Sequence, residues 1–218
     1  MKAIEMGKVI LDLCGGTGAW SRPYADAGYT VYNITLPRYD IMSTYIGESY
    51  PGQIYFRVEE TLLIEISKVY GILAAPDCAH FSFARNRAKS PRDIPGAFEL
   101  VKKCREIIEA CALYGNLKFW CLENPKGYLY PILGLPPFKF VRWHFGDLGN
   151  KSTYLWGNFN FPKMKPKPEL RDNAFIMSGC WHKITIPSGY RKKGWDSKKI
   201  KRAITPPGFS MAFFKANR

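Results

Sequence analysis

Three short segments of the sequence combine residue types that could perform group-transfer chemistry. The first is the glycine-rich run at residues 14–18 (CGGTG), the second is residues 74–82 (AAPDCAHFS) around Cys78, and the third begins at Glu123 (ENP). A glycine-rich turn lets the backbone approach a nucleotide-like ligand closely and leaves amide donors pointing at it. A cysteine thiolate is a soft nucleophile, and a carboxyl group can hydrogen-bond a ring nitrogen. Together these segments predict a site for a small-molecule donor beside a nucleophile.

Cys78 and Glu123 are residue types that could activate a pyrimidine ring. Carbon-5 of a pyrimidine is a poor nucleophile until a soft nucleophile adds to carbon-6, which Cys78 could do while Glu123 hydrogen-bonds nitrogen-3. Carbon-5 could then accept a methyl group from a sulfonium donor held over residues 15–18, and loss of the carbon-5 proton would release Cys78. A base in a duplex would first have to be flipped out of the stack.

Each segment also has a simpler structural interpretation. The glycine-rich run could be a tight strand-to-helix turn, Cys78 an incidental loop cysteine, and Glu123 part of a turn or a helix cap. The glycine-rich run is not followed by a Lys-Ser/Thr pair, which argues against a phosphate-cradling P-loop. The basic residues that follow Cys78, from His80 to Arg92, would favour its thiolate form. The occurrence of all three segments in one chain favours the chemical interpretation.

An apolar run that predicts a buried strand leads into each segment. These runs cover residues 8–13 (KVILDL), 69–75 (VYGILAA) and 117–122 (LKFWCL), and residues 97–114 have the three-to-four apolar spacing of an amphipathic helix. Strands that alternate with helices indicate an α/β fold with a doubly wound, mostly parallel sheet. Ligands of such sheets bind outside the carboxyl ends of the strands, which is where all three segments are expected.

The rest of the chain predicts further elements and a three-part organisation. We expect a helix at residues 19–27, strands at 29–36, 138–145 and 152–156, and a closing helix at 206–217. Little periodicity occurs between residues 162 and 202. We therefore predict a catalytic core at residues 1–157, a small irregular basic segment at 158–202, and a C-terminal helix at 203–218 that returns to the core.

The charge of the chain suits a polyanionic partner. The chain carries 32 Lys and Arg against 18 Asp and Glu, a net charge of +14, and residues 163–202 contain twelve basic and three acidic residues, a net +9. Such a stretch could contact phosphates, although solubility alone is another reason for it. Three aromatic residues within it could either stack on bases or form a small core: Trp181, Tyr190 and Trp195.

Several classes of protein are disfavoured. The sequence has no run of eighteen apolar residues and no secretion leader, so we expect no membrane span, a cytoplasmic location and reduced cysteines. It has no CxxC pair, and its three histidines do not cluster at metal-ligand spacing, so we expect no metal site. We also expect a monomer.

The order of motifs resembles the DNA cytosine-5-methyltransferase family, and specifically its short phage-type members with a reduced target-recognition region. Residues 12–21 (DLCGGTGAWS) look like the family's first motif, residues 76–82 (PDCAHFS) like the PPCQxFS motif of the nucleophile, residues 123–125 (ENP) like the ENV motif, and residues 203–213 (AITPPGFSMAF) like the closing motif. The resemblance covers almost the whole chain. It implies a Rossmann-like methyltransferase fold, S-adenosylmethionine as cofactor, and DNA with a flipped cytosine as partner.

The resemblance assigns roles to individual residues. The catalytic residues would be Cys78, Glu123 and Lys151. The cofactor would be bound by Asp12, Leu13, Cys14, Gly15, Gly16, Thr17, Gly18, Trp20, Asn33, Thr35, Asp40 and Pro76. The substrate would be contacted by His80, Ser82, Arg85, Asn124, Pro125 and Thr153.

Some positions in the cofactor and nucleophile motifs depart from the family's pattern. Cys14 replaces the usual phenylalanine, and Asn33 or Thr35 would have to replace the acidic residue that binds the cofactor ribose. Asp77 stands beside Cys78 in place of a proline. Its negative charge should disfavour the thiolate and slow the reaction.

The parts that would recognise the substrate are reduced. The family's QxRxR motif is represented by GNKST, with Lys151 and Thr153 in place of the arginines, and about forty-five residues separate Gly157 from the closing motif. Weak sequence specificity is therefore expected. Two alternatives remain open: the same chemistry on RNA or on a free pyrimidine nucleotide, and a catalytically silent nucleic-acid-binding relative.

Overall fold

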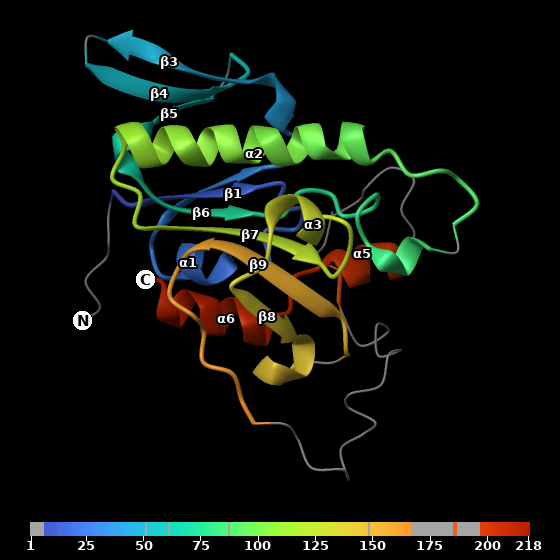
Figure 1. The fold of residues 1–218 in the computed structure, drawn as a ribbon. Helices are drawn as coiled ribbons and strands as arrows, with labels where there is room; N and C mark the ends of the chain where they lie inside the picture. The colour runs from blue at the N-terminus through green and yellow to red at the C-terminus, as the bar shows by residue number, and fades with distance from the viewer. Residues whose placement is uncertain are drawn as a thin grey trace.

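The computed structural model describes residues 7–50, 52–60, 62–86, 88–147, 149–166, 185–186 and 197–218. Most of the predicted basic segment, including Trp181, Tyr190 and Trp195, lies outside the described residues. The described residues form an α/β structure with two sheets (Figure 1). Among them, no helix combines the length and the apolar character that a membrane span requires.

The central sheet has six strands in the order β2-β1-β6-β7-β9-β8. In chain order these are β1 (Val9–Leu13), β2 (Thr30–Ile34), β6 (Val69–Ala74), β7 (Phe119–Pro125), β8 (Phe138–Val141) and β9 (Ser152–Asn158). The first four strands of that order are mutually parallel, whereas β9 runs antiparallel to β7 and β8. The prediction of an α/β fold with a mostly parallel sheet is confirmed.

Helices cover both faces of the central sheet, which explains why its inner strands are mostly apolar. α2 (Ile94–Tyr114) lies across one face, and α1 (Arg22–Asp26) and α6 (Pro207–Ala216) lie on the other (Figure 1). Leu11 of β1 belongs to the core cluster under α2, whereas Ile10 belongs to the cluster with α1 and α6. Because successive side chains of a strand point to opposite faces, a strand covered on both sides needs apolar residues on both.

A second, antiparallel sheet lies beyond α2 and was not predicted (Figure 1). It consists of β3 (Thr44–Tyr50), β4 (Gln53–Val58) and β5 (Leu62–Glu65). Phe56 and Ile64 are buried and belong to the same core cluster as the buried side chains of α2, but neighbouring positions of β4 and β5 are partly or fully exposed. These strands therefore lack the continuous apolar run that indicated the central strands.

The remaining helical elements are short. They are α3 (Tyr130–Leu133), α5 (Ser197–Ala203) and the 3-10 helices η1 (Ile41–Ser43), η2 (Ile66–Lys68), η3 (Phe83–Arg85) and η4 (Arg142–Phe145). The predicted helix at residues 19–27 is shortened to α1, and α5 is helical within the segment that was expected to be irregular.

The predicted strand at residues 138–145 is correct only in its first half. It ends at Val141 because the chain turns inward there, into η4. The buried Arg142 guanidinium donates hydrogen bonds to the carbonyl groups of Arg202, at 2.9 Å, and of Ile204, at 3.1 Å. This contact fixes the end of α5 to the core.

An aromatic layer holds α6 against the sheet. Phe209 of α6 is fully buried, and its ring contacts those of Trp20, Phe140, Phe145 and Phe213. The Phe140 and Phe209 rings are stacked, with 4.2 Å between their centroids. Burying such rings removes a large apolar area from water, so this layer should contribute strongly to stability.

Phe209→Ala should lower the free energy of unfolding by about 3–5 kcal/mol, because it removes a buried ring and leaves a cavity. Urea unfolding followed by circular dichroism would measure the loss. Met211 lies on the same helix with 43% of its surface exposed, so Met211→Ala should cost less than about 1 kcal/mol. Equal losses in the two variants would contradict the packing described here.

Candidate active site

A cavity of about 550 Å³ opens at the carboxyl ends of the parallel strands. β1 lies between β2 and β6, so the loops that follow β1 and β6 lead in opposite directions across the sheet. Open α/β sheets bind ligands at such a reversal of strand order. The volume falls within the roughly 300–1,000 Å³ typical of small-molecule pockets.

The wall of the cavity contains ten residues that the sequence placed around a cofactor or a nucleophile. They are Cys14, Gly15, Gly16, Thr17, Thr35, Asp40, Pro76, Cys78, Glu123 and Lys151. Sequence reasoning missed the apolar side chains that share the wall, among them Leu36, Tyr39, Ile41, Met42, Leu100 and Ile200. None of these lies in a recognisable motif, so only the fold brings them to the site.

The glycine-rich turn after β1 is shaped by the buried side chain of Asp12. Ser21 Oγ donates a hydrogen bond to Asp12 Oδ2 at 2.5 Å. A Cβ atom added to Gly15 would lie 2.2 Å from the carboxyl carbon of Asp12, so the turn can close over this side chain only with glycine there. Burial raises the pKa of Asp12 to about 6, and the hydrogen bond from Ser21 opposes the rise.

The same turn is tied to the end of β2. Asn33 Nδ2 donates to the Gly16 carbonyl at 3.1 Å, and the Gly16 amide donates to Thr35 Oγ1 at 3.3 Å. Asn33 therefore supports the turn and is not part of the cavity wall, whereas Thr35 is in the wall. Of the two candidates for replacing a ribose-binding acidic residue, Thr35 is the one at the cavity.

Three other predicted cofactor residues lie away from the cavity wall. Leu13 is buried in the core cluster under α2. Trp20 has 1% of its surface exposed and packs against Phe209 and Phe213 in the aromatic layer. Gly18 closes the glycine-rich turn with a φ of 71°, and its amide donates to the Gly15 carbonyl at 3.0 Å.

Cys78 lies in a tight turn directly after β6. The amides of Phe81 and Ser82 donate to the Cys78 carbonyl at 3.1 and 2.9 Å, which folds the backbone around this residue. Its half-buried side chain belongs to the cavity wall, as do those of Glu123 and Lys151. Lys151 Nζ lies 3.8 Å from Glu123 Oε1. A thiol, a carboxylate and an ammonium group therefore meet in one cavity.

The surroundings of Cys78 keep its thiol protonated at rest. Burial raises the pKa of the thiol, Lys151 lowers it, and the negative charges of Glu123 and Asp77 raise it further. The expected effect of Asp77 is thus present. Among the described residues, the cation that lowers the pKa of the thiol is Lys151, which comes from a distant part of the chain.

The predicted substrate residues after Cys78 brace their own loop and are not in the cavity wall. The Asp93 amide donates to His80 Nδ1 at 2.7 Å, and Arg85 Nη1 lies 3.1 Å from the same atom. Ser82 Oγ accepts a hydrogen bond from the Ala84 amide at 3.2 Å. These contacts connect the loop to the start of α2.

The predicted substrate residues near Glu123 lie on the two strands beside the cavity. Asn124 is buried, and its Nδ2 donates to the Pro76 carbonyl at 3.0 Å, which ties the end of β7 to the Cys78 turn. Pro125 and Thr153 are register partners in β7 and β9. Asn124 thus positions Glu123 relative to Cys78.

No family model matches the sequence, and no curated protein is significantly similar to it. Within the described residues, no group of three or more His, Cys, Asp or Glu side chains is arranged to hold a metal ion. The function is therefore inferred from the cavity and the residues around it.

Asp12 should make stability depend on pH. Folding raises its pKa from 3.8 to about 6, so its contribution to stability is fully present below about pH 4 and is lost as pH rises through about 6. At about 1.4 kcal/mol per pH unit, the loss approaches 3 kcal/mol. Asp12→Asn keeps an acceptor for Ser21 and does not titrate.

The free energy of unfolding of both proteins can be measured in urea at about pH 4 and at pH 7. From the lower to the higher pH, the wild type should lose about 3 kcal/mol of stability relative to Asp12→Asn. Asp26→Asn, which changes an exposed carboxylate on α1, serves as the control and should keep the wild-type pH dependence. An Asp12→Asn protein with unchanged pH dependence would show that Asp12 does not titrate as inferred.

Substitutions of the charges around Cys78 should shift its pKa in opposite directions. Asp77→Asn should lower the pKa, because it removes a repulsive negative charge, and Lys151→Met should raise it. The pH dependence of Cys78 alkylation by iodoacetamide, followed by mass spectrometry of its peptide, reports both shifts. Lys118→Met changes an exposed lysine that precedes β7 and should leave the profile unchanged. Shifts of the same sign in the Asp77 and Lys151 variants would be incompatible with this site.

Proposed function

We propose that this protein transfers a methyl group from S-adenosylmethionine to carbon-5 of cytosine in DNA, through a covalent adduct of Cys78. The observation that carries the proposal is the shared cavity: the glycine-rich turn, Cys78, Glu123 and Lys151 all contribute to its wall. A donor and an acceptor bound there would be next to both the nucleophile and the carboxylate. The resemblance of the motif order to DNA cytosine-5-methyltransferases supports the same reaction and a Rossmann-like methyltransferase fold.

The residues around the glycine-rich turn suit the proposed cofactor. The backbone of Gly15 and Gly16 borders the cavity without side chains, and the Thr35 hydroxyl and the Asp40 carboxylate offer polar contacts for a nucleoside. Apolar side chains such as Tyr39 could pack on an adenine ring. When bound, S-adenosylmethionine supplies an electrophilic methyl group.

Cys78 would begin the reaction by adding to carbon-6 of the cytosine. Its thiol must first lose a proton, and the positive charge of Lys151 favours that loss. Addition would move the electron pair of the ring's carbon-5–carbon-6 double bond onto carbon-5, while a protonated Glu123 carboxyl group would donate a hydrogen bond to nitrogen-3 and stabilise the altered ring. Carbon-5 would then bond to the methyl group as the bond between that methyl group and the donor's sulfur breaks, which would leave S-adenosylhomocysteine as the second product.

The reaction would end with the elimination of Cys78 from carbon-6 of the ring. The proton on carbon-5 leaves to a base, and its electron pair restores the double bond as the carbon-6–sulfur bond breaks. Cys78 departs as a thiolate, which Lys151 stabilises. The net change replaces one hydrogen of cytosine with a methyl group and releases one proton.

A second candidate function is nucleic-acid binding without methyl transfer. The observation that favours it is the raised pKa of Cys78, since two carboxylates and burial all oppose the reactive thiolate. The same chemistry on RNA or on a free pyrimidine nucleotide is the other alternative. Comparing DNA, RNA and dCMP as substrates distinguishes it.

The purified protein should transfer labelled methyl groups to DNA in preference to RNA or dCMP, and DNA that contains 5-fluorocytosine should become covalently attached to it. A fluorine on carbon-5 cannot leave as a proton does, so the adduct with Cys78 accumulates. Gel mobility and peptide mass spectrometry would identify the attached residue.

Cys78→Ala should abolish both the transfer and the adduct. Cys111→Ala, which removes a thiol buried in α2 outside the cavity wall, is the control and should retain both. Methyl transfer by Cys78→Ala would exclude this mechanism. Nucleic-acid binding without S-adenosylmethionine binding in calorimetry would favour the silent candidate.

A further inference from the structure

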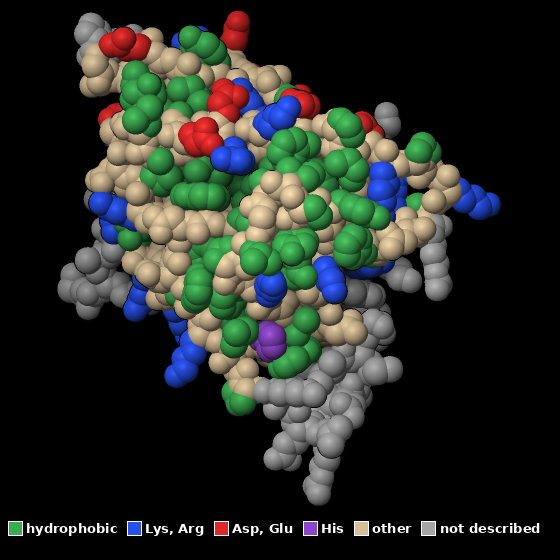
Figure 2. All heavy atoms as spheres, viewed as in Figure 1, with side chains coloured by type: hydrophobic (Ala, Val, Ile, Leu, Met, Phe, Trp, Pro, Cys, Tyr) green, Lys and Arg blue, Asp and Glu red, His purple; other side chains and the backbone are tan. Residues whose placement is uncertain are grey.

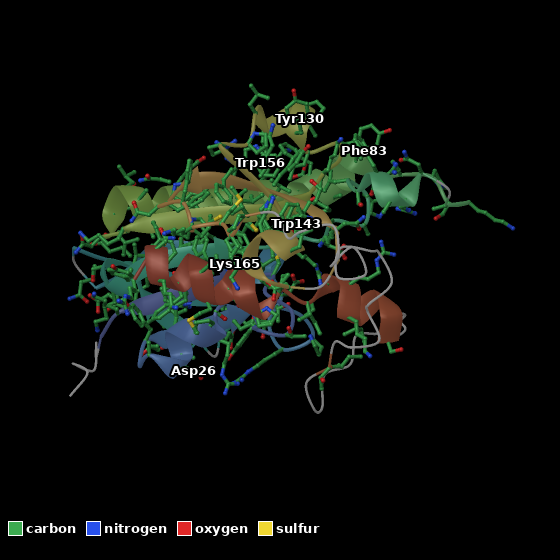
Figure 3. All side chains as sticks on the ribbon, turned by 90° about the horizontal axis from the view of Figure 1, so that it is seen from below. Asp26, Phe83, Tyr130, Trp143, Trp156 and Lys165 are labelled. Atoms are coloured by element: carbon green, nitrogen blue, oxygen red, sulfur yellow. The ribbon has the colours of Figure 1, made fainter. Side chains whose placement is uncertain are left out.

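Three aromatic side chains are exposed on the surface beside the candidate active site. Phe83, Tyr128 and Tyr130 have 39%, 42% and 41% of their surface exposed, and we refer to them as the aromatic platform. The rings of Phe83 and Tyr128 meet edge to face, with 5.0 Å between their centroids. Figure 3 shows Phe83 and Tyr130 on the same side of the molecule, opposite Asp26. Large exposed rings next to a catalytic cavity often mark a binding surface.

The platform is built from the two loops that carry the proposed chemistry. Phe83 follows Cys78 and Tyr128 follows Glu123, each by a few residues. The loops run side by side: the Tyr128 amide donates to the Phe81 carbonyl at 2.9 Å. A ligand that contacts the platform therefore lies against the two loops that lead from Cys78 and from Glu123.

Glycine permits this close approach of the two loops. A Cβ atom added to Gly127 would lie 2.2 Å from the Phe81 carbonyl oxygen, and Gly127 forms a β-bridge with Ser82. The geometry of the platform thus depends on backbone contacts that leave its rings free to face outward.

Arg92 fixes the platform and adds positive charge. Its guanidinium lies 4.9 Å from the centre of the Tyr128 ring, and it donates to the carbonyl groups of His80 at 2.7 Å and Ser82 at 3.0 Å. A guanidinium over an aromatic face is an attractive contact that also holds the ring in place.

The surroundings of the platform favour a polyanion. Residues 78–92 and 126–146 contain no Asp or Glu, although Asp93 and Asp147 directly follow them, and their exposed cations include Lys89, Lys126 and Lys139. Figure 2 shows the acidic side chains of this face over α2 and the antiparallel sheet, where some Lys and Arg side chains also lie, whereas the part over α3 is mainly hydrophobic with Lys and Arg side chains around it. Exposed rings within a positively charged surface are the arrangement by which proteins bind single strands without sequence readout.

We propose that the aromatic platform binds single-stranded DNA by base stacking and delivers an unpaired cytosine to the Cys78 cavity. Bases of a duplex are stacked on one another and cannot offer their faces to the rings, whereas bases of a single strand can. An unpaired target also avoids most of the free-energy cost of base flipping. This suits a chain whose region for recognising a duplex is short. The inference rests on the proposed function, because the strand is the substrate of that reaction.

Fluorescence anisotropy with labelled strands tests the platform, on a Cys78→Ala background without methyl donor. Phe83→Ala, Tyr128→Ala and Tyr130→Ala should each weaken binding of a short oligodeoxythymidine by roughly tenfold, since each removes a stacking surface. An abasic strand of equal length keeps the phosphates but has no bases, so the three substitutions should barely change its weaker binding. Tyr128→Phe keeps the ring and should restore binding.

Tyr114→Ala is the matched control. Tyr114 is 54% exposed at the last turn of α2, about 27 Å along the helix from Gly96 at the cavity, so its removal should leave all affinities unchanged. Thermal unfolding of each variant would verify that the protein remains folded.

Four outcomes overturn the platform: equal binding of the thymidine and abasic strands, tighter binding of duplex than of single strands, tighter binding of single-stranded RNA than of DNA, or no effect of the ring substitutions. The first outcome would show that phosphate contacts alone carry the binding. The methyl-transfer assay decides the proposed function separately. Ring-dependent binding without methyl transfer would refute the enzyme alone, and transfer to duplex DNA unaffected by ring substitutions would refute the platform alone.

Discussion

The carboxyl group of Asp12 fills the space beneath the turn that follows β1, where it accepts a hydrogen bond from Ser21 and leaves no room for a side chain at Gly15. Burying this group is costly, as its raised pKa indicates. The contact nevertheless fixes the turn that borders the cavity, and hydrogen bonds between Gly16 and the end of β2 extend the constraint to the neighbouring strand. The wall proposed to bind the cofactor is therefore held by contacts within the protein.

The parallel register of β1, β6 and β7 positions the part of the site that contains Cys78 and Glu123. Leu13 pairs with Ala74, and Ala74 pairs with Leu122, so the loops after these strands emerge at the same level. Burial of Cys78 in this arrangement makes its thiolate unfavourable, Lys151 partly offsets the effect, and the negative charge of Glu123 adds to it. A nucleophile held as a thiol is less prone to oxidation.

Backbone contacts extend the site to the molecular surface. The Cys78 loop and the Glu123 loop are joined by hydrogen bonds and by the close approach at Gly127, so the surface rings and the cavity belong to one framework. Arg142 anchors the chain after α5, whose Ile200 lies in the cavity wall. The aromatic layer under α6 supports the opposite face of the sheet and makes no direct contribution to the wall.

The central strands, α2, α6 and the three chemical segments could be predicted from the sequence, because apolar periodicity and glycine-rich turns are encoded by neighbouring residues. Which motif residues reach the cavity depends on packing between distant segments: Asn33 supports a turn, and Trp20 packs in the core. The antiparallel sheet could not be predicted from the sequence, because its strands mix exposed and buried positions without a regular pattern. The approach of Lys151 to Glu123 follows from the pairing of β7 with β9, and such pairing depends on how distant segments pack, which no local pattern records.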